Sequence, residues 1–592
     1  MAGVGALAAA IVVLGEGSLA AARRVQSALG GALIHGLAGR VSAADCVFAD
    51  FGDALRRLFV EDTPIVAFCA AGIVIRALAP LLSDKRAEPP VLAVAEDGSA
   101  VVPLLGGLRG LNALARAIGE AVNTAPAITT TGEVRFGAAL ENPPDGYELR
   151  NPGDAKRFMS DLLAGDRVRL SGDAPWLIRT RLPFAADGRL SIAVTAEERE
   201  PAEREMIFHP RSVAVALVAG CPDLPQLVLN ALGRLGLSRR AVAAIIAVER
   251  HAARSEIHAA AAALERPLRL VETAMPLGDD RELIAGLLAR AVPDPIAAPA
   301  IDGPVGVAIA ASPIAVTALG RGRGHLAVVG LGPGGGGWMI AEARKALTAA
   351  QDIVGYETYL RMAGPFQATQ IVHPSDNRAE MDRARHALVL AARGRRVAIV
   401  SSGDPGVFAM ASAVMEALDG SDDPAWHGVE LMVIPGISAA HAAAARAGAP
   451  LGHDFCALSL SDNLKPWAVI ERRLALAAAA DLVLALYNPV SRARPWQLGR
   501  AVEIVRGYRA PATPVVLGRD LGRPGESTRV LSLAELSAAD ADMRTVVIIG
   551  SSTTRVLPRA DGGRWVYTPR RYAGSLPPFN EPAASAPKGS PR

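Results

Sequence analysis

Short apolar runs alternate with longer, alanine-rich stretches along most of this 592-residue chain. Apolar runs of roughly four to eight residues bounded by turn residues indicate buried strands, and apolar positions at helical spacing indicate amphipathic helices. The pattern predicts strands at 11–14, 64–68, 91–94, 213–218, 244–248 and 305–310, and helices at 19–29, 111–122, 225–235 and 257–264. Strands that alternate with helices predict α/β modules in series.

A third block, from about 326 to 556, carries four unusual turns at the ends of predicted strands. Each turn consists of small, polar or rigid residues: GLGPGGGG at 330–337, SSGDPGVF at 401–408, PGISAA at 435–440 and YNP at 487–489. In open α/β sheets, ligands bind at the carboxyl ends of the strands. Four such turns in one block therefore predict a single ligand cleft.

The glycine-rich turn also fits a different ligand. Gly330, Gly332 and Gly335 match the G-x-G-x-x-G spacing of dinucleotide-binding loops, and Glu357 follows about twenty residues later, where a ribose-binding carboxylate is expected. An NAD-dependent oxidoreductase is therefore an alternative interpretation. The glycine pattern does not by itself distinguish the two ligands, so the other three turns have to decide.

Composition narrows the function classes. Hydrophobic residues make up 51% of the chain, enough for several large cores, and the formal net charge of +3 is too small to indicate a nucleic-acid partner. The four cysteines form no C-x-x-C pair, which indicates buried thiols in a reducing cytosol and no metal site. The apolar N-terminus lacks a preceding basic region and ends at Glu16, so it predicts a buried strand rather than a signal peptide or membrane span. We expect a cytoplasmic protein with no membrane partner.

Changes in composition divide the chain into parts. Residues 292–325 are rich in Pro, Ala and Gly, as connecting segments are, and the end of the chain is of low complexity. We predict an α/β region at 1–140, a connecting region at 141–208, a second α/β domain at 209–314, a linker at 315–325, two lobes at 326–430 and 431–556, and a disordered tail at 573–592.

The four turns in their order, within VGLGPG, SSGDPGVFAM, PGISAAHAAAA and LYNP, resemble the tetrapyrrole (corrin/porphyrin) methylase family. Within that family, 452–474 and 487–498 are similar to the precorrin-3B C(17)-methyltransferase type. The resemblance implies a two-lobed class III methyltransferase fold, S-adenosylmethionine as cofactor and a corrinoid substrate. It implies methylation of precorrin-3B at C-17 with ring contraction to precorrin-4, in cobalamin biosynthesis. It also implies a homodimer formed through the methylase domain.

The resemblance further implies which positions contact the methyl donor and the substrate. Pro333 and Gly334 would border the tetrapyrrole cleft. The other implied positions would hold the donor: Ser402, Gly403, Asp404, Val407, Ser438, Ala439, Asn488 and Gly518. The carboxylate of Asp404 can accept hydrogen bonds from hydroxyls or an ammonium group, and the alternative for this residue is to cap its own turn.

A substrate with many acetate and propionate groups needs cations, and arginine forks suit carboxylates best. The main candidates are Arg492 and Arg494, which directly follow the YNP turn, together with Lys465 and Arg472, and further ones are Arg378, Arg383, Arg385 and Arg473. The ring rearrangement also requires proton transfer, for which His453, Asp454 and Asp462 are candidates without assigned roles.

The first half of the chain resembles a second family. Residues 64–133 are similar to the CbiG family of cobalt-precorrin-5A hydrolases, which open a lactone on the corrin ring, and 211–310 resemble the C-terminal CbiG/CobE domain. Leu108 stands where that family has a histidine, and a leucine cannot move a proton. A hydrolase and an accessory module both remain open, and so does a corrinoid-binding carrier with an inactive methylase block.

Overall fold

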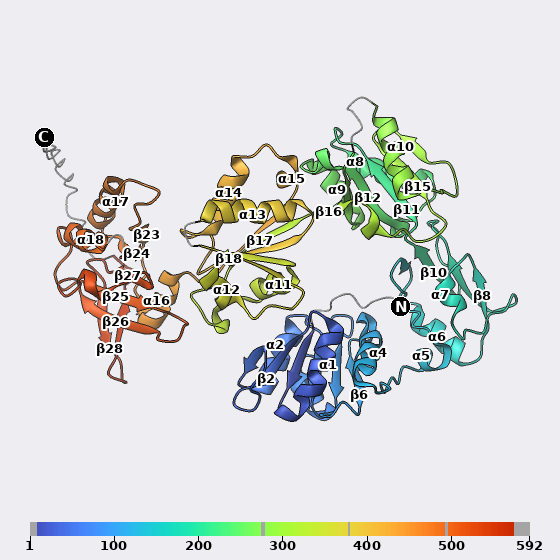
Figure 1. Ribbon diagram of the computed structural model, residues 1–592, viewed down its shortest axis with the longest axis horizontal. Helices are drawn as coiled ribbons and strands as arrows, with labels where there is room; N and C mark the ends of the chain where they lie inside the picture. Colours follow the sequence, from blue (N-terminus) through green and yellow to red (C-terminus); the bar gives the residue numbers. More distant parts are fainter. Residues whose placement is uncertain (1–8, 274–278, 377–378, 492–494, 573–592) are drawn as a thin grey trace.

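The computed structural model describes residues 9–273, 279–376, 379–491 and 495–572. Three of the predicted substrate-binding arginines, Arg378, Arg492 and Arg494, lie outside these ranges, as does the predicted tail. The described chain forms several α/β units in series, coloured from blue to red in Figure 1. The predicted α/β class is confirmed. None of the helices in the described ranges is both long and apolar enough to cross a membrane.

The N-terminal unit is a doubly covered, mostly parallel sheet with strand order β3-β2-β1-β4-β5-β6, in which only β6 runs antiparallel. Its strands are β1 (Ala10–Val13), β2 (Leu33–Leu37), β3 (Cys46–Phe48), β4 (Ile65–Phe68), β5 (Val91–Val94) and β6 (Val101–Leu105). One face packs against α1 (Leu19–Leu29) and α4 (Leu111–Val122), and the other against α2 (Phe51–Val60) and α3 (Ala71–Leu78). Because helices cover both faces, the central strands are apolar throughout.

Two further sheets follow. The first has the order β7-β10-β9-β8, with β7 (Tyr147–Leu149), β8 (Val168–Ser171), β9 (Leu190–Val194), β10 (Glu205–Pro210) and the helices α5 (Thr131–Phe136), α6 (Ala155–Leu163) and α7 (Pro175–Ile178). The second has the order β14-β15-β11-β12-β13-β16, with β11 (Val213–Leu217), β12 (Val242–Val248), β13 (Leu268–Val271), β14 (Ala300–Asp302), β15 (Val305–Ile309) and β16 (Arg321–Gly322). Its helices are α8 (Leu224–Arg234), α9 (Ser255–Leu264) and α10 (Asp280–Ala291).

The predicted linker at 315–325 is thus partly structured. Within it, β16 pairs antiparallel with β13, so this segment completes the third sheet before the chain enters the next unit. The guanidinium group of Arg269 holds the segment in place through the carbonyl oxygens of Thr317, Leu319 and Gly320. Pairing between positions some fifty residues apart is a tertiary contact that composition does not predict.

The first lobe of the last block is a parallel sheet with the order β19-β18-β20-β17-β21. Its strands are β17 (His325–Gly330), β18 (Asp352–Tyr356), β19 (Ile371–Ser375), β20 (Arg396–Ser401) and β21 (Glu430–Ile434), and its helices are α11 (Ala341–Ala349), α12 (Glu357–Ala363), α13 (Glu380–Ala392), α14 (Met410–Asp419) and α15 (Pro424–His427). The prediction began the second lobe at 431, whereas β21 pairs with β17 and is an edge strand of the first lobe.

The second lobe is a mixed sheet with the order β23-β24-β27-β25-β26. Its strands are β23 (Phe455–Ser459), β24 (Val483–Tyr487), β25 (Pro514–Arg519), β26 (Ser527–Ser532) and β27 (Thr545–Ile549), and its helices are α16 (Ala439–Ala447), α17 (Trp467–Ala479) and α18 (Gln497–Arg506). The chain continues past 556 into a hairpin of β28 (Arg555–Pro558) and β29 (Arg564–Tyr567), which pairs with β22 (Gly448–Ala449).

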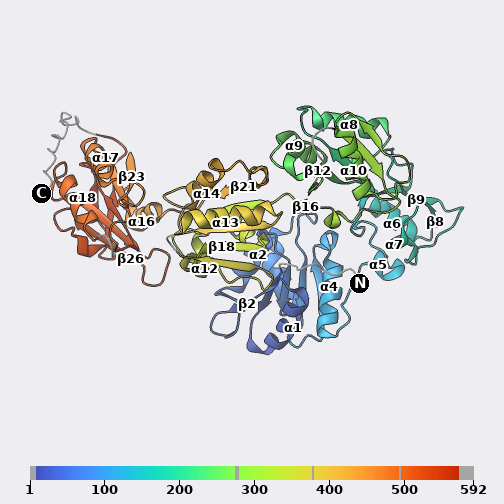
Figure 2. The same ribbon diagram turned by 45° about the horizontal axis from the view of Figure 1, so that its top comes forward.

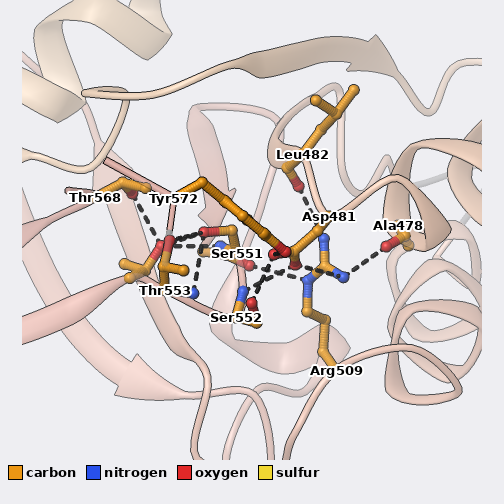
Figure 3. A network of polar contacts seen from close by, with 11 residues as sticks. Ala478, Asp481, Leu482, Arg509, Ser551, Ser552, Thr553, Thr568 and Tyr572 are labelled. Carbon is orange, nitrogen blue, oxygen red and sulfur yellow. Dashed lines mark hydrogen bonds and ion pairs between the residues drawn. The ribbon is translucent and has the colours of Figure 1, made fainter. Parts of the chain in front are cut away.

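A buried polar network ties the C-terminal end of the described chain to the second lobe (Figure 3). Asp481 accepts hydrogen bonds from the hydroxyl groups of Ser552 (2.6 Å) and Tyr572 (2.9 Å), and it pairs with Arg509 at 3.0 Å. The guanidinium group also donates to the carbonyl oxygens of Ala478, Leu482 and Gly550. Both charges are therefore fully partnered inside the core, as burial requires.

Two of the units before the methylase-like block, the N-terminal and the third, lie beside its first lobe (Figures 1 and 2). The N-terminal unit contacts α11 through an ion pair between Glu61 and Arg344 at 3.1 Å. The third unit contacts α15, where a side chain at Gly428 would collide with the backbone of Ala252. Both contacts join segments that lie more than 170 residues apart in the chain.

Candidate active site

The three turns of the first lobe meet at the carboxyl end of its sheet, because β20, β17 and β21 are neighbours there. Gly332 and Gly403 exchange two backbone hydrogen bonds of 3.1 and 2.7 Å. A Cβ atom at Gly330 would lie 2.6 Å from the amide nitrogen of Gly436, and one at Gly436 would collide with the carbonyl oxygen of Gly403. These glycines are needed because three backbones approach one another more closely than side chains allow.

A cavity of about 550 Å³ lies between these turns and the second lobe. Of the ten residues predicted to bind the donor or border the cleft, nine line this cavity: Pro333, Ser402, Gly403, Asp404, Val407, Ser438, Ala439, Asn488 and Gly518. Gly334 does not line it and packs instead against the side chain of Arg523. The four turns that are separate in the sequence therefore surround a single space.

Asp404 has a structural role as well as a place in the cavity wall. One carboxylate oxygen accepts the backbone N–H of Gly406 at 2.8 Å, and the other accepts that of Gly436 at 3.0 Å. The side chain thus joins two of the three turns, and no cation lies within ion-pair distance of it in the described ranges. Each oxygen keeps a free lone pair, so the carboxylate can still accept a hydrogen bond from a ligand in the cavity.

The second lobe contributes the opposite wall. Asn488 adopts a left-handed backbone conformation (φ +52°) and donates from its side-chain amide to the hydroxyl of Ser459 at 3.0 Å. The hydroxyl of Tyr487 accepts the backbone N–H of Ala440 at 3.1 Å, which holds the start of α16 beside the strand end. The rings of Tyr487 and Phe408 meet edge to face at 5.3 Å and give the cavity an apolar surface.

Three arginines line the cavity, and only Arg383 was among the sequence candidates. Arg383 is 3% exposed, and no carboxylate lies within ion-pair distance of it in the described ranges. It donates to the hydroxyl of Ser375 (2.7 Å), the carbonyl of Asp376 (2.6 Å) and the sulfur of Met410 (3.2 Å). Burial lowers the pKa of this guanidinium below its ordinary value, so an anionic ligand would stabilise its charge.

The other two arginines, Arg523 and Arg544, come from turns of the second lobe. Arg523 reaches across to the first lobe and donates to the carbonyl oxygen of Pro333 (2.7 Å) and the hydroxyl of Ser402 (3.0 Å). Arg544 pairs with the buried Asp520 at 3.2 Å. A usable signal for Arg523 was present in the sequence, because DLGRPG follows the strand β25 directly, as the other cavity-lining turns follow their strands.

Apart from Arg383, the predicted acid–base and substrate residues within the described ranges do not line the cavity. His453 and Asp454 precede β23, so they lie at the amino end of that strand, opposite Asn488, which follows the parallel neighbour β24. Asp462 accepts a hydrogen bond from Gln497 at 3.4 Å. Lys465 reaches the rim, where its ammonium lies 5.8 Å from the ring of Phe408, and Arg472 belongs to α17.

The alternative dinucleotide interpretation fits the geometry poorly. The glycines at 330, 332 and 335 contact neighbouring turns, and the next α-helix starts only at Ala341. Glu357 does not line the cavity and forms an exposed ion pair with Arg361 at 2.7 Å.

The described residues include no group of three or more His, Cys, Asp or Glu side chains suited to hold a metal ion.

Known proteins match both halves of the chain. Residues 325–537 match the model of the tetrapyrrole (corrin/porphyrin) methylases, and residues 53–133 match that of the cobalamin synthesis G N-terminal family. The precorrin-3B C(17)-methyltransferase of Sinorhizobium sp is 55% identical over 253 residues, which is 43% of this chain and 98% of that protein. The chain belongs to the tetrapyrrole methylase family. Its first half carries a CbiG-type N-terminal module.

Further relatives differ in how much of their length is matched. The cobalamin biosynthesis protein CobIJ of Mycobacterium bovis is 52% identical over 42% of this chain, but the chain spans only 48% of that protein. A crystal structure of the methyltransferase CobJ is 49% identical, covers 42% of this chain and 100% of its own, and superposes with a TM-score of 0.39.

In the CbiG-type module, Leu108 stands in a glycine-flanked turn at the position where a histidine was expected. Leu108 is half-buried between Gly106 and Gly110, which both have φ +85°. Next to it, Arg109 pairs with Asp62 at 2.9 Å. Burial raises the pKa of the Cys69 thiol to about 11, so the thiol stays protonated at neutral pH. Neither Leu108 nor Cys69 therefore supplies a general base.

Proposed function

We propose that residues 325–556 transfer the methyl group of S-adenosylmethionine to C-17 of precorrin-3B, with ring contraction to precorrin-4 in cobalamin biosynthesis. The observation that carries this proposal is the convergence of nine predicted positions on one cavity. The 55% identity to a precorrin-3B C(17)-methyltransferase along nearly its whole length supports the same substrate. A carrier without activity would have no need of a donor pocket built from four separate turns.

The donor supplies a methyl group that its sulfonium already activates, so the chain has to bind, orient and exclude water. The glycines and alanines of the turns let a ligand approach the backbone closely, as at Gly403 and Ala439. Asp404 offers a carboxylate to hydroxyl or ammonium groups of the donor. Phe408 and Tyr487 offer flat apolar surface to a macrocycle.

We further propose that Arg383 and Arg523 bind substrate carboxylates. Both line the cavity, and no carboxylate pairs with either in the described ranges. An arginine fork held by neutral acceptors retains its charge for an incoming carboxylate.

The decisive experiment for the proposed methyl transfer incubates the full chain with precorrin-3B and labelled S-adenosylmethionine and follows the mass of the product. Stoichiometric S-adenosylhomocysteine with a singly methylated, ring-contracted product is expected, and no label in the macrocycle would refute the proposal.

Replacing Asp404 tests the donor pocket. We expect Asp404→Ala to weaken S-adenosylmethionine binding about 10- to 100-fold, since hydrogen bonds to a charged group contribute roughly 1.5–3 kcal/mol and the two turns lose their connection. Isothermal titration calorimetry measures the affinity, and thermal unfolding checks the fold. Asp419→Ala, an exposed carboxylate at the end of α14, is the matched control. An affinity for Asp404→Ala equal to that of the control would remove this residue from the donor site.

The role of the CbiG-type module follows from Leu108. We propose that it acts as an accessory to the methylase rather than as a lactone hydrolase, because the turn carries no group that moves a proton. A fused neighbour raises the local concentration of a labile intermediate. Incubation with a corrinoid lactone, followed by mass analysis, should detect no addition of water. Rapid lactone opening would overturn this assignment.

We also propose a homodimer formed through the methylase lobes. Both outer strands β21 and β23 expose apolar side chains: Met432 and Val433 are 41% and 43% exposed, and Phe455 is 39% exposed. Open apolar edge strands are usually covered by a partner. Light scattering should give about twice the 61.3 kDa chain mass, and Val433→Lys should shift it toward the monomer, unlike Val556→Lys on β28. A monomeric wild type would contradict the proposal.

The four free cysteines support a reducing, cytoplasmic location.

A further inference from the structure

A second and larger cavity, of about 1140 Å³, lies between the third unit and the first lobe. One wall comes from the end of α9 and the turn into β13, and the other comes from the amino ends of β17, β18, β20 and β21. Figures 1 and 2 both show α9 and β16 beside this lobe. We call this space the interdomain groove.

The interdomain groove is separate from the 550 Å³ cavity between the two lobes of the last block, which we call the methylase cavity. The methylase cavity lies at the carboxyl ends of the parallel strands, and the groove lies at their amino ends. The strand β17 spans six residues between these two edges, which at ~3.3 Å per residue is about 17 Å. The two lining sets share no residue. A ligand in the groove therefore cannot occupy the donor site.

Positive charge dominates the groove. Its basic lining residues are Arg266, Arg269, Arg323, Arg395 and Arg396, against the acidic residues Glu265 and Glu430. Burial lowers the pKa of His258 and His325, which also line the groove, so these two add little to the charge at neutral pH. Three arginines are already paired: Arg266 with Glu148, Arg323 with Glu430 and Arg395 with Asp352. The positive charge that remains for a ligand must therefore come from the other two arginines, Arg269 and Arg396.

Arg269 and Arg396 have no carboxylate partner in the described part of the chain. Arg269 donates only to the carbonyl oxygens of 317, 319 and 320, which fix its position without neutralising it. The side chain of Arg396 is exposed and forms no hydrogen bond or ion pair with another described residue. In addition, the buried Nε of Arg266 has no hydrogen-bond partner. Uncompensated arginines in a shared cavity favour an anionic ligand.

The size and lining of the groove indicate how large that anion is. Pockets for small ligands measure roughly 300–1,000 Å³, so this groove exceeds what a single phosphate or carboxylate fills. Between the arginines lie apolar surfaces, among them Ala262, Ala349 and Ile371, and Ile371 is 51% exposed. Cations around apolar surface suit a flat apolar ring whose edge carries several carboxylates.

We propose that the interdomain groove is a second binding site for a polycarboxylate tetrapyrrole, distinct from the methylase cavity. The ligand class rests on the proposed function, since it is the class of the methylase substrate, but the site rests on the groove's own charge and volume. A tetrapyrrole held there stays on the same chain as the methylase. Its effective concentration near the active site is thereby raised without any change in the chemistry.

The test titrates the full chain with uroporphyrin, a stable octacarboxylate porphyrin, and follows its fluorescence. We expect wild type to show a binding event that Arg396→Glu weakens at least tenfold and Arg396→Lys retains. The side chain of Arg396 forms no hydrogen bond or ion pair with another described residue, so its replacement should leave the fold intact, as thermal unfolding should verify. Arg269→Gln should act in the same direction, and Arg555→Glu, an exposed arginine on β28, should have no effect.

Separate outcomes distinguish this site from the methylase. Binding that Arg383→Gln abolishes and Arg396→Glu leaves unchanged would overturn the groove proposal, because all uroporphyrin would then bind in the methylase cavity. Complete displacement of uroporphyrin from the Arg396-dependent site by millimolar inorganic phosphate would also overturn it in favour of a small-anion site. Methyl transfer from S-adenosylmethionine should be unchanged in Arg396→Glu. If the wild-type chain transferred no methyl group, the proposed function would be refuted. The uroporphyrin titration would still test whether the groove binds a tetrapyrrole.

Discussion

Gly436→Ala should abolish S-adenosylmethionine binding, with an affinity loss of at least about 100-fold. Its new methyl group would collide with the carbonyl oxygen of Gly403 and would lie 3.0 Å from Cα of Gly330. Because all of these neighbours are backbone atoms, no side chain can rotate away, and overpacking of this kind costs typically 1–3 kcal/mol or more. The turns must separate, which pulls the amide of Gly436 away from Asp404 and opens the donor pocket.

Calorimetric titration with S-adenosylmethionine measures this loss, and circular dichroism checks that the lobe still folds. Gly499→Ala is the matched control, because a Cβ there would have no neighbour within 4 Å and the residue lies within α18. Wild-type affinity in Gly436→Ala would mean that the three turns do not form the donor site. A variant that unfolds would be replaced by Gly330→Ala, whose Cβ would lie 2.8 Å from Cδ of Pro405.

Arg509→Met should destabilise the second lobe by about 3–5 kcal/mol, the usual cost of removing one partner of a buried ion pair. The side chains of Arg509 and Asp481 are only 3% and 6% exposed, so the change leaves an uncompensated carboxylate and removes the hydrogen bonds of the guanidinium group to three carbonyl oxygens. Chemical denaturation monitored by tryptophan fluorescence measures the free energy of unfolding. The double variant Arg509→Met with Asp481→Leu should recover part of the loss, because it removes the stranded charge as well.

The same network makes stability depend on pH. Burial by itself would raise the pKa of Asp481, but the hydrogen bonds from Ser552 and Tyr572 and the charge of Arg509 together lower it below its ordinary value of 3.8. A carboxyl with a lowered folded-state pKa stabilises the fold above its unfolded pKa and loses that contribution as pH falls through the folded value. The second lobe should therefore weaken below about pH 4. Asp481→Asn should flatten this dependence, and Asp454→Asn, an exposed carboxyl, should not.

Much of the fold follows from local pattern. The predicted helices at 19–29 and 111–122 coincide with α1 and α4, and the predicted strand at 91–94 coincides with β5. These elements are clear in the sequence because each one buries a continuous apolar stripe, and burial imposes the helical or strand period on the residues. The four turns that surround the cavity are equally clear, since a parallel sheet places the turns at the carboxyl ends of neighbouring strands on the same edge.

The distribution of charged side chains did not follow from the sequence. Among more than a hundred charged residues, spacing alone does not tell which ones reach a cavity from another lobe, as Arg523 does, or tie two turns together, as Asp404 does. His453 and Asp454 were plausible by type but lie at the opposite end of their strand from the cavity. The relevant contacts join positions far apart in the chain.

The sequence alone therefore determined the α/β class, the order of the units and the methylase turns, because these depend on short-range periodicity and on residues with special backbone freedom. Only the tertiary structure decided where the lobes divide, which arginines face the methylase cavity and that the interdomain groove exists. The physical reason is that long side chains such as arginine select partners by distance in space. That distance is set by the packing of whole units against one another, which no local pattern records.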